Sequence, residues 1–196
     1  STDNKKEIVV VLGAGRTGTS LLMQILEKLG LNVSEEMTPP SEQNLQGGYE
    51  DSQVYDIHTK ILQTLGVNQM FPLPEGWIDD PCIEKIQKEL LGIIKNQVNK
   101  ASTIWGVKDP RFTMFLPMWH SIFNRAKVIP HYILAVREPA SVVRSMKMQY
   151  NTRESLAELY WMQQNCDALH NTGGNCFIVH YEEWFDKSTE IAEELA

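Results

Sequence analysis

A short apolar run followed at once by a glycine-rich loop is the feature that most constrains the fold of this chain. Residues 8–12 are Ile, Val, Val, Val and Leu, a series typical of a strand buried on both faces. The loop 13–18 follows, and from residue 21 onward leucine and isoleucine recur at helical spacing. Backbone N–H groups and the helix dipole favour an anion at the start of a helix, and glycine lets a phosphate approach the main chain. The sequence therefore predicts a phosphate-binding loop between a buried strand and a helix.

The loop departs at one position from the pattern of metal-dependent phosphoryl transfer. Gly13 and Gly18 have the spacing of G-x-x-x-x-G-K-[ST] and Ser20 stands at its last position, but Thr19 replaces the lysine. Kinases and ATPases use that lysine, together with a metal ion, to neutralise a highly charged phosphoryl group. The only cation of the loop is Arg16. We therefore expect a transferred group of lower charge and no metal.

A second phosphate-binding element is predicted near residue 137. The run 131–136 is another candidate for a buried strand, and Pro139 suits the first turn of a following helix. Arg137 then lies at the carboxyl end of a strand, the edge at which open α/β sheets bind their ligands. Ser145 is eight residues further on, about two turns along that helix.

The two elements together resemble those of sulfotransferases that use 3′-phosphoadenosine-5′-phosphosulfate (PAPS). In that family a loop of the form [PG]-[KR]-[ST]-G-[ST]-[ST] binds the 5′-phosphosulfate. The corresponding residues of this chain are Gly15, Arg16, Thr17, Gly18, Thr19 and Ser20. The family's Arg and Ser for the 3′-phosphate correspond to Arg137 and Ser145. The resemblance extends over residues 8–196, is closer to the bacterial and tyrosylprotein-type branches, and implies an enzyme that moves a sulfuryl group from PAPS to an acceptor hydroxyl.

Two further segments are similar to the bacterial members. Residues 44–51 (NLQGGYED) resemble N-x-x-G-[FYW]-x-E shortened by one residue, and residues 105–111 (WGVKDPR) resemble W-G-x-K-D-P-R. Sulfuryl transfer needs a cation near the bridging oxygen, and we assign Arg16, whose fork can hold two oxygens. Lys108 is a candidate for stabilising the sulfonate, or it forms an ion pair with Asp109. Arg111 either clamps a ligand or is a solvated turn residue.

Four residues compete as the base that accepts the proton of the acceptor hydroxyl. Glu50 is favoured, because it precedes a predicted helix and the related bacterial segment also has a glutamate there, but a carboxylate in this position is also a common helix cap. Glu35 and Glu36 lie about twenty residues beyond the loop arginine, as in tyrosylprotein-type enzymes, or are solvated loop residues. His58 lies on an apolar helical stripe, so a core position is favoured over a role as base.

Composition restricts the partners and the compartment. With 18 basic against 25 acidic residues the net charge is −7, which argues against nucleic acid as a general partner. No metal site is predicted, because the histidines lack companion ligands at suitable spacing. Three widely spaced cysteines, no long apolar run and no signal peptide suggest a cytoplasmic protein without a transmembrane segment. The acceptor, whether carbohydrate, lipid, peptide or small molecule, and the oligomeric state are not encoded in these patterns.

Strands alternate with helices along the whole chain. We predict strands at 8–12, 103–107, 131–136 and 175–180, and helices at 18–29, 51–65, 81–99, 113–125, 139–150, 153–170 and 188–196. This order implies one domain over 1–196 with an α/β, three-layer P-loop NTPase-like fold, a mostly parallel sheet and helices on both faces.

Two alternatives to a working sulfotransferase stay open at this point. Asp109 after a strand is a candidate magnesium ligand, as in a nucleotide-kinase-like phosphotransferase. A catalytically inactive nucleotide-binding module is the other. The basic, glycine-containing late loop of many sulfotransferases has no counterpart after Tyr181, so the chain either uses another lid or is truncated at its C-terminus.

Overall fold

A computed structural model describes residues 5–39 and 47–196 of the chain. The four strands form one parallel sheet in the order β2-β1-β3-β4. They are β1 (Lys6–Leu12), β2 (Trp105–Lys108), β3 (Val128–Val136) and β4 (Phe177–His180). The helices are α1 (Thr19–Lys28), α2 (Ser52–Leu65), α3 (Pro81–Lys100), α4 (Phe112–Ala126), α5 (Pro139–Tyr150), α6 (Glu154–Thr172) and α7 (Ser188–Leu195), with short 3-10 turns at Trp77–Asp79 and Tyr181–Phe185.

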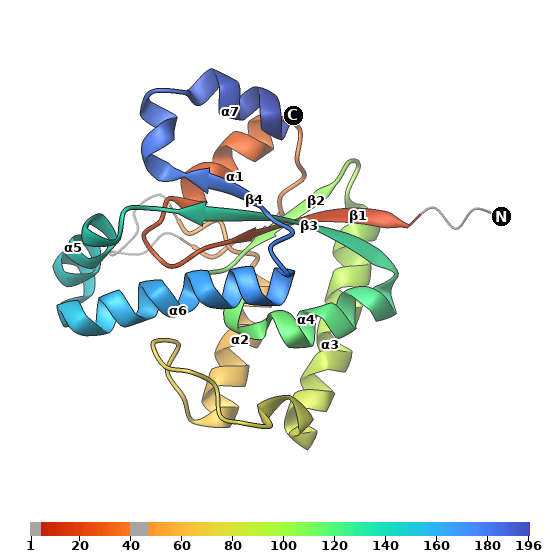
Figure 1. Cartoon of the computed structure of the whole chain (residues 1–196). Helices are drawn as coiled ribbons and strands as arrows, with labels where there is room; N and C mark the ends of the chain where they lie inside the picture. The colour runs from red at the N-terminus through yellow and green to blue at the C-terminus, as the bar shows by residue number, and fades with distance from the viewer. Residues whose placement is uncertain (1–4, 40–46) are drawn as a thin grey trace.

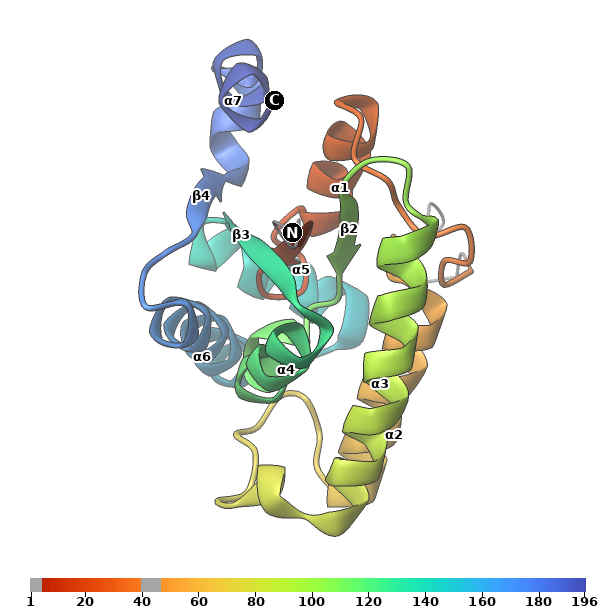
Figure 2. The same ribbon diagram turned by 90° about the vertical axis from the view of Figure 1, so that its right-hand side faces the viewer.

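Helices cover both faces of the sheet, as predicted (Figure 1). Alternate residues of β1 point to opposite faces. Ile8, Val10 and Leu12 pack into a core with α2, α3 and α4, whereas Val11 packs with α1 and Ile191 of α7. Both faces of the central strand are therefore buried, which explains its uninterrupted apolar sequence. Figure 2, turned by 90° from Figure 1, shows the two helical layers on either side of the strands.

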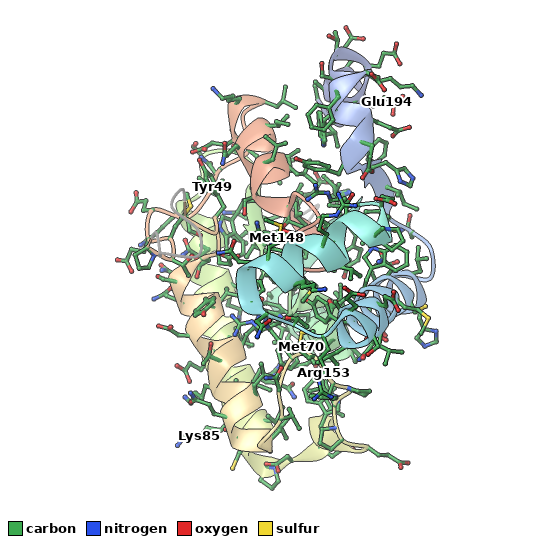
Figure 3. The ribbon with its side chains drawn as sticks, turned by 90° about the vertical axis from the view of Figure 1, so that its left-hand side faces the viewer. Tyr49, Met70, Lys85, Met148, Arg153 and Glu194 are labelled. Carbon is green, nitrogen blue, oxygen red and sulfur yellow. The ribbon has the colours of Figure 1, made fainter. Side chains whose placement is uncertain are left out.

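The carboxyl ends of all four strands meet at one edge of the sheet because the strands are parallel. Figure 3 looks toward the molecule from that side, with α5 lying in front and Met148 on the outer surface of that helix. The glycine-rich loop leaves β1 here, and Lys108, Arg137 and Tyr181 lie at or directly after the ends of β2, β3 and β4. The topology thus gathers chemically active side chains from distant parts of the sequence.

Strand β3 begins three residues earlier than predicted. Lys6 of β1 pairs in register with Val128, and the pairing continues through Pro130 and His131. Pro130 is tolerated because β4 pairs with β3 only from Ile133 onward, so the other side of β3 is still an open edge at that point.

Among the described residues, none of the helices is both long enough and apolar enough to span a bilayer.

The close packing of Leu31, in the segment after α1, against β2 yields a prediction about stability. A Cβ at Gly106 would lie 2.1 Å from Cδ2 and 2.7 Å from Cγ of Leu31, whereas a Cβ at Gly92 inside α3 would meet nothing within 4 Å. We expect Gly106→Ala to lower the free energy of unfolding by about 1–3 kcal/mol through overpacking. The matched change Gly92→Ala should raise it by about 0.5–1 kcal/mol, since alanine is the better helix former. Urea denaturation measures both, and equal stabilities would contradict the packing described.

Candidate functional site

The loop between β1 and α1 is held in a tight conformation. Gly13, Arg16 and Gly18 all have positive φ angles, of 146°, 73° and 86°. A Cβ at Gly13 would lie 2.7 Å from the carbonyl oxygen of Ala135, so the loop runs directly against β3. Inside the loop the hydroxyl of Thr17 donates to the carbonyl of Ala14 at 2.7 Å. These contacts shape the loop before any ligand binds.

The start of α1 has the properties of an anion site. Its N-cap, Gly18, offers no side-chain cap, and the first turn, which contains Thr19 and Ser20, has no acidic residue. The N–H of Gly15 donates to the hydroxyl of Tyr160 at 3.1 Å, which connects the loop to α6. Burial raises the pKa of Tyr160 to about 12, so this hydroxyl adds no negative charge beside the loop at neutral pH. An anion is therefore favoured here by the helix dipole and is not opposed by a nearby carboxylate in the first turn.

The two predicted phosphate elements are brought into contact. Arg16 Nε donates to Ser145 Oγ at 3.0 Å, and Arg137 Nη1 donates to the carbonyl of Arg16 at 3.1 Å. Arg137 Nε is buried and has no hydrogen-bond partner among the described residues. An arginine nitrogen left unpaired in a buried position has capacity for an additional acceptor.

Tyr181 belongs to the same cluster, although the sequence analysis did not assign it a role. Its ring lies 4.3 Å from the guanidinium carbon of Arg137, and a Cβ at Gly18 would lie 2.4 Å from Tyr181 Cδ2. Tyr181 directly follows β4. Its position at the carboxyl end of a predicted strand was the signal available in the sequence, since such ends collect at one edge of the sheet.

Lys108 connects the loop with the segment before α2. Its Nζ contacts the carbonyl of Gly48 and a carboxylate oxygen of Glu50, and it lies 3.2 Å from Ser20 Oγ. Ser20 in turn donates to the Gly48 carbonyl at 2.9 Å. The Lys108 side chain is 3% exposed and that of Glu50 is 11% exposed. Lys108 thus pairs with Glu50, and the alternative of an ion pair with Asp109 is wrong.

The carboxylate of Glu50 is held in one place by its surroundings. Thr38 Oγ1 donates to Glu50 Oε2 at 2.9 Å. A Cβ at Gly48 would lie 1.5 Å from that same oxygen, so only glycine leaves room for it. The cap of α2 is supplied by Asp51, whose side chain accepts from the N–H of Val54 at 2.9 Å. The alternative that Glu50 serves as the helix cap is therefore wrong. Asn44–Gln46 of the resembling segment lie outside the described residues.

The other three candidate bases lie elsewhere. Glu35 and Glu36 are exposed and line a polar hollow together with Trp105. Trp105 is the first residue of β2 and Lys108 is the last, so this hollow is at the opposite end of the strand from Lys108. His58 is fully buried, and its Nε2 accepts a hydrogen bond from Trp119 Nε1 at 2.9 Å. Burial lowers the pKa of His58, and the nearby Asp109 only partly offsets this. These contacts match the core position that the sequence favoured for His58.

Asp109 and Arg111 form a buried ion pair. Arg111 donates from Nε to Oδ1 at 2.8 Å and from Nη2 to Oδ2 at 2.6 Å, and its backbone N–H reaches Oδ1 at 2.7 Å. Burial alone would raise the pKa of Asp109, but the charge of Arg111 and the contact with His58 outweigh it and hold that pKa well below its ordinary value. Both carboxylate oxygens are engaged within the protein, and Arg111 is not the solvated turn residue of the second interpretation. The described residues contain no group of three or more His, Cys, Asp or Glu side chains arranged to hold a metal.

Comparisons with known proteins bear on the family and the fold of the chain. A model of the sulfotransferase family matches residues 8–195. Among solved structures, the sulfotransferase domain of the olefin synthase from Synechococcus PCC 7002 is similar with a TM-score of 0.60 and 17% identity, over 98% of this chain and 73% of that one. A putative kinase from Chloroflexus aurantiacus is similar at a TM-score of 0.46 and 14% identity, over 97% of each chain. No curated protein sequence matches the chain significantly. The family match covers nearly the whole chain, and on that ground the chain belongs to the sulfotransferase family.

Proposed function

We propose that this protein transfers a sulfuryl group from PAPS to a hydroxyl-bearing acceptor by in-line displacement. The observation that carries the proposal is the contact of Lys108 with both Ser20 of the loop and Glu50. The ammonium of Lys108 therefore lies between the loop, where the sulfuryl group would be bound, and the carboxylate of Glu50, which could act as the base. The donor supplies a sulfuryl group on a phosphate, and the remaining chemistry falls to the residues of the chain.

Binding of the donor is assigned to the loop and to the end of β3. The backbone of residues 15–20 would hold the 5′ end, with the start of α1 favouring its negative charge. Arg137 and Ser145 would hold the 3′-phosphate. The unpaired Nε of Arg137 supports this assignment, because a phosphate oxygen would satisfy a buried donor that the protein leaves open.

Each step of the transfer has a candidate residue. The hydroxyl oxygen of the acceptor molecule forms a bond to sulfur, and Glu50 takes up the proton of that hydroxyl. The bond from sulfur to the bridging oxygen breaks, and its electron pair stays on the leaving phosphate. Arg16 stabilises that developing charge, while Lys108 stabilises the sulfonate oxygens. The hydrogen bond of Arg16 to Ser145 implies that Arg16 must change partners when the donor is bound.

The position of Lys108 supports transfer without a metal ion. In P-loop NTPases the serine or threonine that ends the loop motif is a magnesium ligand. Here the corresponding hydroxyl, of Ser20, lies 3.2 Å from the ammonium of Lys108. This ammonium occupies the side of the Ser20 hydroxyl that a divalent cation would need, and it would oppose a second cation there. Asp109, the carboxylate that a phosphotransferase would need, is already paired with Arg111.

Removing the guanidinium of Arg137 tests the assignment of the 3′-phosphate site. We expect Arg137→Ala to weaken binding of adenosine 3′,5′-bisphosphate about 10- to 100-fold, since a charge-assisted hydrogen bond contributes about 1.5–3 kcal/mol. Calorimetry measures the affinity. Arg144→Ala is the matched control, because Arg144 is an exposed arginine on the same helix as Ser145. Unchanged affinity in Arg137→Ala would contradict the assignment.

Neutralising Glu50 tests the assignment of the base. Glu50→Gln preserves the shape of the side chain, so bisphosphate binding should stay within about threefold while kcat falls about 10²- to 10⁴-fold. Release of adenosine 3′,5′-bisphosphate from PAPS, measured across alcohols, phenols, sugars and hydroxylated lipids, supplies the rate. Glu35→Gln and Glu36→Gln are the controls and should leave kcat unchanged. A large loss in either control, with an active Glu50→Gln enzyme, would move the base to the polar hollow.

A further inference from the structure

A buried polar chain runs behind Lys108 and is not used by any step above. Trp119 Nε1 can only donate, so His58 Nε2 is the acceptor and the proton of the neutral imidazole is on Nδ1. That nitrogen lies 3.3 Å from Asp109 Oδ2. Asp109 is thereby in contact with His58 on one side and with Arg111 on the other. His58 and Asp109 have fully buried side chains, and that of Arg111 is 7% exposed.

The far end of Arg111 is attached to α2. Its Nη1 donates to Thr59 Oγ1 at 2.8 Å, and its Nη2 donates to the carbonyl of Tyr55 at 3.1 Å. The guanidinium carbon also lies 4.3 Å from the centre of the Tyr55 ring. Arg111 therefore joins the turn after β2 to one face of α2 through two hydrogen bonds and a cation–π contact.

These contacts fix the relative position of the two elements that carry the proposed catalytic pair. Asp109 follows Lys108 directly, at the end of β2, and Glu50 lies two residues before α2 starts at Ser52. A shift of α2 against β2 would move Glu50 against Lys108. The connection through Arg111 opposes that shift, and it spans 52 residues of sequence between Thr59 and Arg111.

We propose that Asp109 and Arg111, supported from behind by His58, form a clamp that positions Lys108 against Glu50. All three are positioning residues, because within residues 5–39 and 47–196 their side chains form hydrogen bonds and ion pairs with one another, with α2 and with Trp119, and none with the loop, Lys108 or Glu50. The effect of the clamp on turnover rests on the proposed function. Its effect on the position of Lys108 does not, because that position can be measured without donor or acceptor.

Two variants weaken the clamp at different points. Arg111→Lys keeps a positive charge but cannot bind both oxygens of Asp109 and also reach Thr59 and Tyr55. Thr59→Val keeps the shape of the side chain and removes the hydroxyl that accepts from Arg111 and that also donates to the carbonyl of Tyr55 within α2 at 2.9 Å. If Arg111→Lys fails to fold, Thr59→Val still tests whether the contact between Arg111 and α2 positions Lys108. Lys60→Ala is the control. Lys60 follows Thr59 in α2, and it forms an exposed ion pair with Glu89 of α3.

The first readout is the ¹⁵Nζ resonance of Lys108 in the ligand-free protein, assigned with Lys108→Met. We expect a resonance protected from exchange in the wild type and in Lys60→Ala, and a shifted or exchange-broadened one in Arg111→Lys and Thr59→Val. The second readout is turnover, where kcat should fall about tenfold or more in both variants while KM for the donor changes less than about threefold, because displacement of reacting groups costs rate.

The outcomes separate the clamp from the proposed function. A shifted Lys108 resonance without bisphosphate binding in the wild type would support the clamp and contradict the proposed function. A protein that binds and turns over normally, with an unchanged Lys108 resonance in both variants, would overturn the clamp and leave the proposed function intact. A lower melting temperature alone, without change in resonance or kcat, would likewise overturn it, since that is the effect of a purely structural contact.

Discussion

The arrangement of this site depends on one buried ammonium group. An ion as buried as the Lys108 side chain is costly unless oxygen atoms surround it. Its partners are a hydroxyl in the first turn of α1 (Ser20), and a main-chain carbonyl (Gly48) and a carboxylate (Glu50) of the segment before α2. The need to compensate one charge therefore brings the end of β2, the start of α1 and the approach to α2 together.

The parallel sheet makes this convergence possible. Each strand delivers its last residues to the same edge, so Lys108, Arg137 and Tyr181 approach the loop after β1 although they are far apart in sequence. The apolar cores on the two faces hold the strands, and polar contacts at the edge then determine which side chains meet. The buried ion pair of Asp109 with Arg111 lies on the core side of this edge, where each charge compensates the other.

The fold was predictable from the sequence because it follows from local patterns. Apolar runs gave the strands, helical spacing gave the helices, and the alternation of the two gave the parallel sheet. The start of β3 was missed because Pro130 argues against a strand unless the open edge beside it is known. The family was also predictable, since the loop and the pair Arg137 and Ser145 are specific motifs, and the family match confirms it.

The contacts within the site were less accessible to sequence reasoning. Sequence patterns favoured Glu50 as the base and a core position for His58, but they left Glu35, Glu36 and His58 as competing candidates. Only the tertiary fold reveals that Glu50 contacts Lys108. The contacts of Tyr181 and of Arg111 join segments separated by many residues. For Tyr181 the sequence offered only its position after a predicted strand, and for the partners of Arg111 it offered no local pattern. The chemical roles of these residues stay predictions.

Binding of a bisphosphate nucleotide without a metal at this edge of the sheet is the property on which the proposed function depends. Calorimetric titration of the wild-type protein with adenosine 3′,5′-bisphosphate in EDTA, and in parallel with ATP and magnesium, measures it. We expect saturable binding of the bisphosphate that magnesium does not strengthen. Binding of magnesium-ATP without binding of the bisphosphate would refute the proposal.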